Sequence, residues 1–119
     1  MSALSNENLK QSGKLGKEAL ESISEMLRML AEPARLALLQ ELKGGEKTVG
    51  ELAIELEIGQ PSVSKHLGIL AGANLVTRRK EGVKVYYSIQ GEFVFPLCRL
   101  VCDKLAADQQ NRAMIDFSI

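Results

Sequence analysis

Apolar residues recur at helical spacing along much of the chain and predict a series of helices. The first begins near Lys17 and ends near Glu32, because the following Pro33 disfavours helical geometry in the residue before it. The second spans Pro33–Leu42, with proline at the first position, where a helix tolerates it. The residues of this second helix expected to face inward are Leu36, Leu39 and Leu42.

Two shorter helices are predicted next, joined by a turn. Thr48 is a favourable N-cap, and Glu51 three residues later completes a capping-box pattern at the start of the first. Gly59 is expected to supply the turn, and the second helix runs from near Gln60 to about Gly72. Its residues expected to pack inward are Val63, Leu67 and Leu70.

The pattern then changes to β-prone segments. Leu75 to Arg79 and Val83 to Ile89 are predicted strands, with Lys80-Glu81-Gly82 as the tip of a hairpin between them. A last helix is predicted from about Phe93 to Gln109. Two helices joined by a short turn form a helix-turn-helix unit, and a hairpin directly after it is a wing. The predicted fold is therefore mainly α with a two-stranded β-wing, a winged helix-turn-helix.

Composition is typical of one ordinary globular domain. The chain has 119 residues, of which 45% are hydrophobic and 25% charged. We expect residues 1–16 to form a flexible polar arm, residues 17–109 the domain, and residues 110–119 a C-terminal tail. No apolar run approaches the roughly 20 residues that cross a bilayer, and the first residues do not resemble a secretory signal. The expected location is cytoplasmic, without a membrane partner and with reduced cysteines.

Charge is distributed unevenly along the sequence. The formal net charge is zero, yet the segment Ile58–Ile89 sums to about +4, because it contains five cationic residues and one anionic residue, Glu81. The remainder must sum to about −4. A concentrated basic segment in a neutral protein indicates a nucleic-acid partner. Its cationic residues are Lys65, Arg78, Arg79, Lys80 and Lys84.

The second helix of the helix-turn-helix carries small and hydrogen-bonding residues away from its apolar face. Such a face suits entry into the major groove of DNA, where bulk would block approach and Gln, Ser and Lys can reach bases or phosphates. Cations on the wing can follow a phosphate backbone or enter a minor groove, although a charged hairpin can also be simply a solvated surface. His66 is the single histidine, and a lone histidine packs or contacts phosphate more often than it binds metal. The outward and flanking residues are Pro61, Ser62, Ser64, Lys65, His66, Gly68 and Ile69.

Four blocks of sequence together resemble the ArsR/SmtB family of bacterial winged-helix repressors. They are LAEPARLALLQEL, TVGELAIEL, GQPSVSKHLGILAGANLV and RRKEGVKVYYSI, and the resemblance covers about Met26 to Leu105. It implies a homodimer through the first and last helices that binds double-stranded promoter DNA, and an inducer, often a metal or metalloid ion, that lowers DNA affinity. The positions that match the recognition helix are Gln60, Ser62, Ser64, Lys65 and His66, and the matching wing is Arg79 to Lys84.

The chain departs from the known sensor sites of that family. Where many arsenic and cadmium sensors carry two thiols on the third helix, this sequence has Ala53 and Glu55. The last helix contains no histidine, which zinc sensors use there. Gln40 stands where persulfide-forming members have a second-helix cysteine. The resemblance therefore does not identify the inducer.

Cys98 and Cys102 are the remaining candidates for sensing. They are four residues apart on the last predicted helix and share one face. Pro96 is expected in the first turn, which would place Cys98 near the helix N-terminus, where the helix dipole lowers a thiol pKa.

Three interpretations of the pair stay open. The two thiols bind a thiophilic ion such as arsenite, with a third ligand from the partner chain, the tail or solvent. Alternatively they act as a redox or reactive-sulfur sensor. In the third interpretation they are small buried hydrophobes. None of these requires a resident cofactor.

Two other classes of function are weaker. A winged helix specialised for protein interaction, with structural cysteines, predicts an apolar or acidic recognition face, which Lys65 and the run Arg78-Arg79-Lys80 argue against. An enzyme would need a nucleophile–base pair, a phosphate loop or a ligand cluster, and the sequence offers none. The prediction is a dimeric DNA-binding repressor and not an enzyme.

Overall fold

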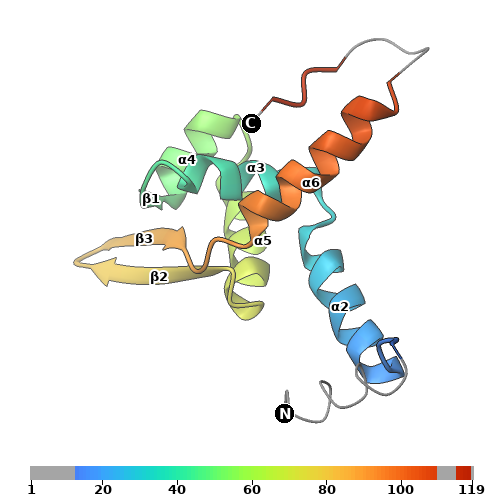
Figure 1. Ribbon diagram of the computed structural model, residues 1–119. Coiled ribbons are helices and arrows are strands. Elements are labelled where there is room, and N and C mark those ends of the chain that lie inside the picture. The colour runs from blue at the N-terminus through green and yellow to red at the C-terminus, as the bar shows by residue number, and fades with distance from the viewer. Residues whose placement is uncertain (1–12, 110–114, 119) are drawn as a thin grey trace. The chain divides into compact units, whose positions relative to one another are not determined.

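The computed structural model describes residues 13–109 and 115–118 and divides the chain into two compact units, Met1–Ile89 and Gln90–Ile119. The second unit contains the helix α6 (Val94–Ala107). Most of the predicted arm and tail lies outside the described residues, and the division at residues 16 and 109 stays a prediction. The first unit contains α2 (Lys17–Leu30), α3 (Pro33–Leu42), β1 (Lys47–Thr48), α4 (Val49–Leu56), α5 (Gln60–Gly72), β2 (Val76–Glu81) and β3 (Lys84–Ile89) (Figure 1).

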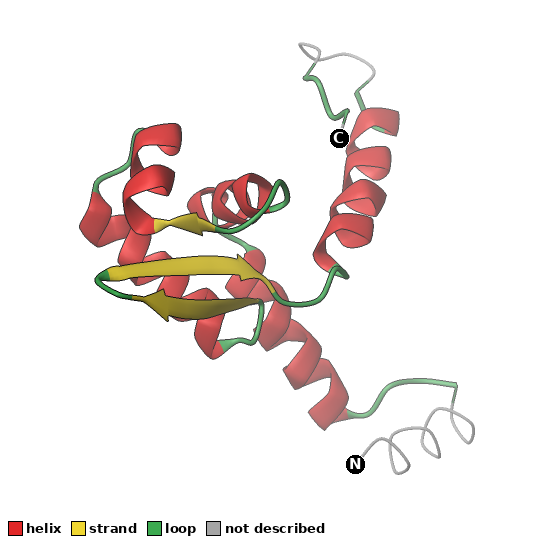
Figure 2. Cartoon of the chain, turned by 90° about the vertical axis from the view of Figure 1, so that its left-hand side faces the viewer, coloured by secondary structure: helices red, strands yellow, loops and turns green. Residues whose placement is uncertain are grey.

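The predicted helices are confirmed, with boundaries shifted by up to two residues at α2 and α6. The sheet differs from the prediction because a third strand, β1, joins the hairpin. The antiparallel sheet has the strand order β1-β3-β2 (Figure 2). β1 pairs with β3 through Lys47↔Tyr87 and Thr48↔Tyr86. A strand of two residues is too short to show the alternation of polar and apolar positions, so the sequence pattern could not reveal it.

The tip of the hairpin also differs from the prediction. Glu81 pairs with Lys84, so the loop is Gly82-Val83, and Lys80 and Glu81 belong to the strand β2. Gly82 has φ +64° at the first loop position, as type II′ turns have, and this conformation favours glycine. Val83 is 99% exposed at the tip. The wing is therefore a regular two-residue hairpin whose cations lie along strands.

The helix-turn-helix is held by two local motifs. The predicted capping box is confirmed: the Glu51 N–H donates to Thr48 Oγ1 (3.1 Å), and the Thr48 N–H donates to Glu51 Oε1 (2.8 Å). This capping box also lowers the pKa of Glu51, chiefly through the hydrogen bond from the Thr48 N–H. The turn itself depends on Glu57 rather than Gly59, because Glu57 is left-handed (φ +55°) whereas Gly59 has φ −61°. The Ile58 N–H donates to the Ala53 carbonyl (3.1 Å), as in a Schellman-type helix end.

The core of the first unit lies between α3, α4, α5 and the sheet. Val63, Leu67 and Leu70 are fully buried, as predicted. The prediction for Leu36 was wrong: it is 38% exposed, and Leu38 is buried in its place. The polar residues of this helix, Arg35, Gln40 and Glu41, are spread around its axis, so its sequence lacks the single polar stripe that would identify the outward face. The other deeply buried residues are Leu39, Leu42, Leu52, Leu75 and Val76.

Candidate nucleic-acid interface

The helix α5 presents a polar face opposite its buried leucines. Pro61, Ser64 and Lys65 are exposed, and Ser62 and His66 are half-buried at the edges of this face. Gln60 is exposed at the N-terminus of the helix. Its side-chain amide lies beside Gly50 at the start of α4, 3.8 Å from the position that a Cβ on Gly50 would occupy. The structure thus groups the predicted recognition-helix residues at one end and one side of a single helix, which contacts β2 at the base of the wing (Figure 1).

The cations of the wing are divided between the two faces of the hairpin. Side chains alternate along a strand, so Arg78 and Lys80 share a face with Val76, and Arg79 lies on the opposite face. Val76 and Tyr87, the cross-strand partner of Arg78, are both buried. Arg78 and Lys80 therefore lie closer to the tip of the wing, on the same face of the hairpin as Val76 and Tyr87, and both are exposed.

Arg79 is engaged within the protein. Its Nη2 lies 2.7 Å from Glu46 Oε2, and its Nη1 lies 2.6 Å from Glu81 Oε1. The guanidinium also stands 4.7 Å from the centroid of the Tyr86 ring, its cross-strand neighbour. Hydrogen bonds to Glu46 and then Glu81 raise the pKa of Arg79, and Arg79 lowers the pKa of Glu81. The positive charge of Arg79 is thus balanced by two carboxylates, one of which, Glu46, lies outside the basic segment Ile58–Ile89.

This difference predicts unequal effects of two neighbouring arginines on DNA binding. We expect Arg78→Gln to reduce the slope of log K against log[salt] by about 0.9, the value for one lost phosphate contact. Arg79→Gln removes the same formal charge, but we expect the slope to stay unchanged because Glu46 and Glu81 already neutralise it. Fluorescence anisotropy over a salt series would measure both slopes. Equal losses for the two variants would show that Arg79 also contacts phosphate.

His66 contacts an arginine that the sequence reasoning missed. Arg35 on α3 places Nη1 3.2 Å from His66 Nδ1. The same guanidinium donates from Nε to the Met29 carbonyl (2.6 Å) and from Nη2 to the Arg28 carbonyl (3.4 Å). Hydrophobic periodicity carries no signal for such a contact, because it joins residues 31 positions apart.

The cysteines lie on α6, both half-buried and both free thiols. The prediction of a lowered pKa for Cys98 was wrong: burial, and then the neighbouring Cys102, raise it. The helix begins at Val94, so Cys98 lies beyond the first turn, where the dipole effect has fallen off. Within residues 13–109 and 115–118 there is no group of three or more His, Cys, Asp or Glu side chains that could hold a metal ion.

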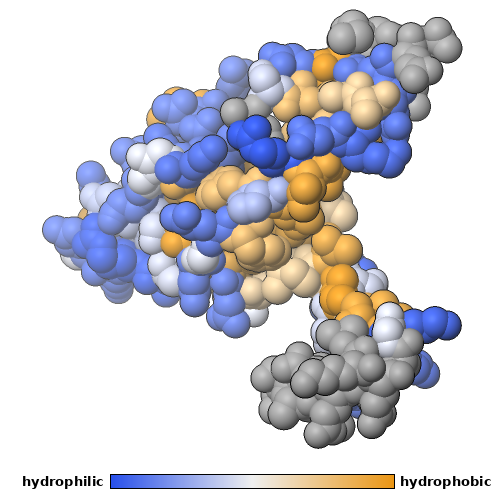
Figure 3. All heavy atoms as spheres, in the orientation of Figure 1, coloured by the Kyte–Doolittle hydropathy of each residue, from blue (hydrophilic) through white to orange (hydrophobic). Residues whose placement is uncertain are grey.

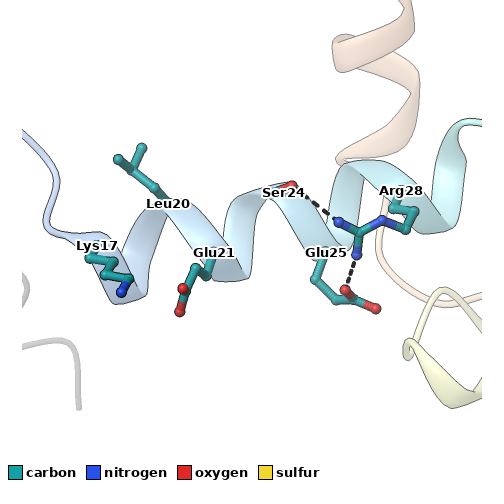
Figure 4. Close-up of a pocket in the computed structure, with 6 residues that line it drawn as sticks. All are labelled: Lys17, Leu20, Glu21, Ser24, Glu25 and Arg28. Carbon is teal, nitrogen blue, oxygen red and sulfur yellow. Dashed lines mark hydrogen bonds and ion pairs between the residues drawn. The ribbon is translucent and has the colours of Figure 1, made fainter.

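Hollows border the helix α2 among the described residues of the first unit. One runs along a single face of α2, from Lys17 to Arg28, and Arg28 there contacts Glu25 and Ser24 (Figure 4). The other, of about 690 Å³, separates α2 from α5. Its lining is largely apolar but includes the charged residues Glu25, Arg28 and Arg35. The helix α5 and its C-cap residue contribute Gly68, Ile69, Gly72 and Ala73. A Cβ added at Gly68 or Gly72 would meet open space. None of the helices in the described ranges is long and apolar enough to span a bilayer.

Comparison with known proteins gives consistent results. Residues 32–78 match the model of the family described as bacterial regulatory protein, arsR family. The chain is 37% identical over 90 residues to the HTH-type transcriptional repressor SmtB of Mycobacterium tuberculosis, covering 76% of this chain and 64% of that protein. It therefore spans less than two thirds of the length of that relative. It is also 39% identical over 97 residues to a Streptomyces lividans protein named "Probable mercury resistance operon repressor", covering 81% of this chain and 74% of that one.

The fold is also shared with a solved structure. The homodimeric winged helix-turn-helix DNA-binding domain of a possible ArsR-family regulator from Mycobacterium bovis superposes with a TM-score of 0.67 at 29% identity. The match covers 86% of this chain and 100% of that domain.

Proposed function

Because the chain belongs to the arsR family, a family of transcriptional repressors rather than enzymes, we propose that it represses a promoter as a homodimer and is released by a thiol-directed inducer. It would act in the cytoplasm, where bacterial promoters are accessible. The observation that supports DNA binding most strongly is the polar, sterically open face of α5, which follows a capped turn and stands beside the wing.

On this proposal, the N-terminal half of α5 enters the major groove. Ser62, Ser64 and Lys65 are placed to reach base edges and phosphates, as is Gln60 at the helix start. Arg78 and Lys80 extend along the wing with no ion-pair partner among the residues that the structure describes, so both are available to phosphates. Lys84 has a different setting, since it helps to lower the pKa of Glu51 and Glu81.

Two helices with exposed apolar stripes support dimerisation. On α2, Leu20, Ile23 and Leu27 are 53%, 43% and 45% exposed, and orange extends along this helix in Figure 3. On α6, the exposed apolar residues are Leu100, Val101 and Leu105. A single chain gains nothing by exposing such stripes, whereas a second copy would bury them. Dimerisation would place two α5 helices about 34 Å apart, in successive major grooves.

Cys98 and Cys102 are the proposed sensing residues. The pair lies one turn apart on α6, and thiolates are the ligands that soft metals and metalloids prefer. Two thiols per chain fit a thiophilic ion if a third ligand comes from the partner chain, the tail or solvent. The relative named for a mercury resistance operon favours this chemistry. A redox or reactive-sulfur response by the same thiols is the second candidate, favoured by their spacing, which lies within reach of a disulfide.

DNA binding can be tested without knowing the operator. The purified full-length chain would be used to select duplexes from a random-sequence library, and its affinity for a selected duplex measured at several salt concentrations. We expect a palindromic consensus, two protomers per duplex, and an affinity that falls steeply with salt because phosphate contacts release counterions. A scrambled duplex of equal length is the control. Failure to enrich any sequence, or binding that ignores salt, would contradict the proposal.

A further inference from the structure

Arg35 joins three helices of the first unit. It projects from the first turn of α3, and its guanidinium bonds the Arg28 and Met29 carbonyls near the end of α2. Carbonyls in the last turn of a helix carry the negative end of the helix dipole, so a guanidinium is a favourable partner there, and the Arg28 carbonyl also accepts from the Ala31 N–H (3.2 Å). The remaining bond reaches His66 on α5.

The chemistry of the Arg35–His66 bond defines the state of the histidine. A guanidinium has only donors, so His66 Nδ1 must accept, and the ring proton must lie on Nε2. The ring is neutral in this arrangement, since a protonated ring has no acceptor. Its Nδ1 edge is therefore committed to Arg35, and only its Nε2 edge is available to another partner.

The three bonds of Arg35 lie beside a groove between α2 and α5. The hollow of about 690 Å³ separates α2 from α5, and its lining includes Met26, Met29 and Ile69. Among the hydrogen bonds between described residues, those of Arg35 are the ones that connect α2 with α5. Arg35 thus links the end of α2 to α5 beside an open groove, in addition to the packing of α3 against both helices.

We propose that Arg35 is a positioning residue for DNA recognition, which holds α5 in its docking orientation by bonding His66 to the end of α2. This proposal rests on the DNA-binding function proposed above. If α2 lies at the dimer contact, the bridge sets how each α5 is aimed relative to the dimer axis. His66 then contributes to DNA affinity through Arg35, at its Nδ1 edge, and not by touching DNA.

The two nitrogens of His66 allow a matched pair of variants. In His66→Asn, the side-chain oxygen occupies about the position of Nδ1 and can still accept from Arg35. In His66→Gln, the terminal amide extends to about the position of Nε2, where a direct contact with DNA would be made. We expect His66→Asn to bind the selected duplex nearly as well as the wild type, and His66→Gln and Arg35→Gln to bind about tenfold more weakly, equal to about 1.4 kcal/mol.

The salt dependence separates positioning from direct contact. Arg35→Gln removes a positive charge, yet its salt slope should equal that of the wild type, because Arg35 contacts carbonyls and not phosphates. A slope reduced by about 0.9 would show a direct phosphate contact and overturn the proposal. Weak binding by His66→Asn together with full binding by His66→Gln would overturn it as well, by placing the function at Nε2. Urea unfolding of each variant identifies losses caused by instability.

A measurement without DNA keeps this proposal distinct from the proposed function. Because the chain has one histidine, its imidazole nitrogens can be assigned directly by NMR in the full-length protein. We expect the Nε2–H tautomer in the wild type and a mixture of tautomers in Arg35→Gln. A mixture already present in the wild type would overturn the bridge even if DNA binding is intact. The expected tautomer in a protein that selects no DNA would instead contradict the proposed function.

Discussion

The double variant Cys98→Ser plus Cys102→Ser will bind its DNA as tightly as the wild type and will no longer be released by arsenite. Serine preserves the size of each side chain, so α6 should keep its packing. It cannot supply a thiolate, however, and the thiolate is both the metal ligand and the reactive nucleophile. A 100-fold loss of DNA affinity on induction corresponds to about 2.7 kcal/mol of coupling, and the double variant should lose all of it.

The measurement is a DNA-binding titration against arsenite, antimonite, cadmium, zinc, peroxide and persulfide. Ala106→Ser, an exposed substitution on the same helix, is the matched control and should respond like the wild type. Loss of the response to peroxide or persulfide, with no response to metals in either protein, would select the redox alternative. A double variant that remains fully inducible would exclude both thiol mechanisms and leave the cysteines as packing residues.

The triple variant Lys65→Gln, Arg78→Gln, Lys80→Gln will lose most of its DNA affinity while keeping its fold. The three side chains are exposed and form no ion pair among the described residues, so their removal should leave the free energy of unfolding nearly unchanged. Three lost phosphate contacts would reduce the salt slope by about 2.7 and the affinity by roughly 100-fold or more near physiological salt.

A charge-matched control tests whether location or net charge is responsible. Lys14→Gln, Lys17→Gln, Lys43→Gln removes the same formal charge away from the proposed interface, and we expect only a small loss of affinity through long-range attraction. The affinities and slopes of both variants can be measured by anisotropy on the selected duplex. Equal losses would show that net charge governs binding and would contradict the assigned interface.

The sequence by itself determined the order and type of the helices and the presence of the wing. Local signals were sufficient there: Pro33 separates α2 from α3, Thr48 with Glu51 starts α4, and the spacing of Val63, Leu67 and Leu70 defines the buried face of α5. Each of these signals acts within about one or two helical turns, a distance over which sequence spacing translates directly into geometry. The family resemblance, which the comparisons confirm, rests on the same segments.

Tertiary structure decided which of the charged residues are available. Glu46 and Arg79 are 33 positions apart, and Arg35 and His66 are 31 apart, yet each pair is in hydrogen-bond contact. A residue count cannot show that Arg79 is neutralised or that His66 already has a partner, because both depend on how separate elements pack. Cationic side chains of the basic run Ile58–Ile89 thus have different roles, set by neighbours that are distant in sequence and close in space.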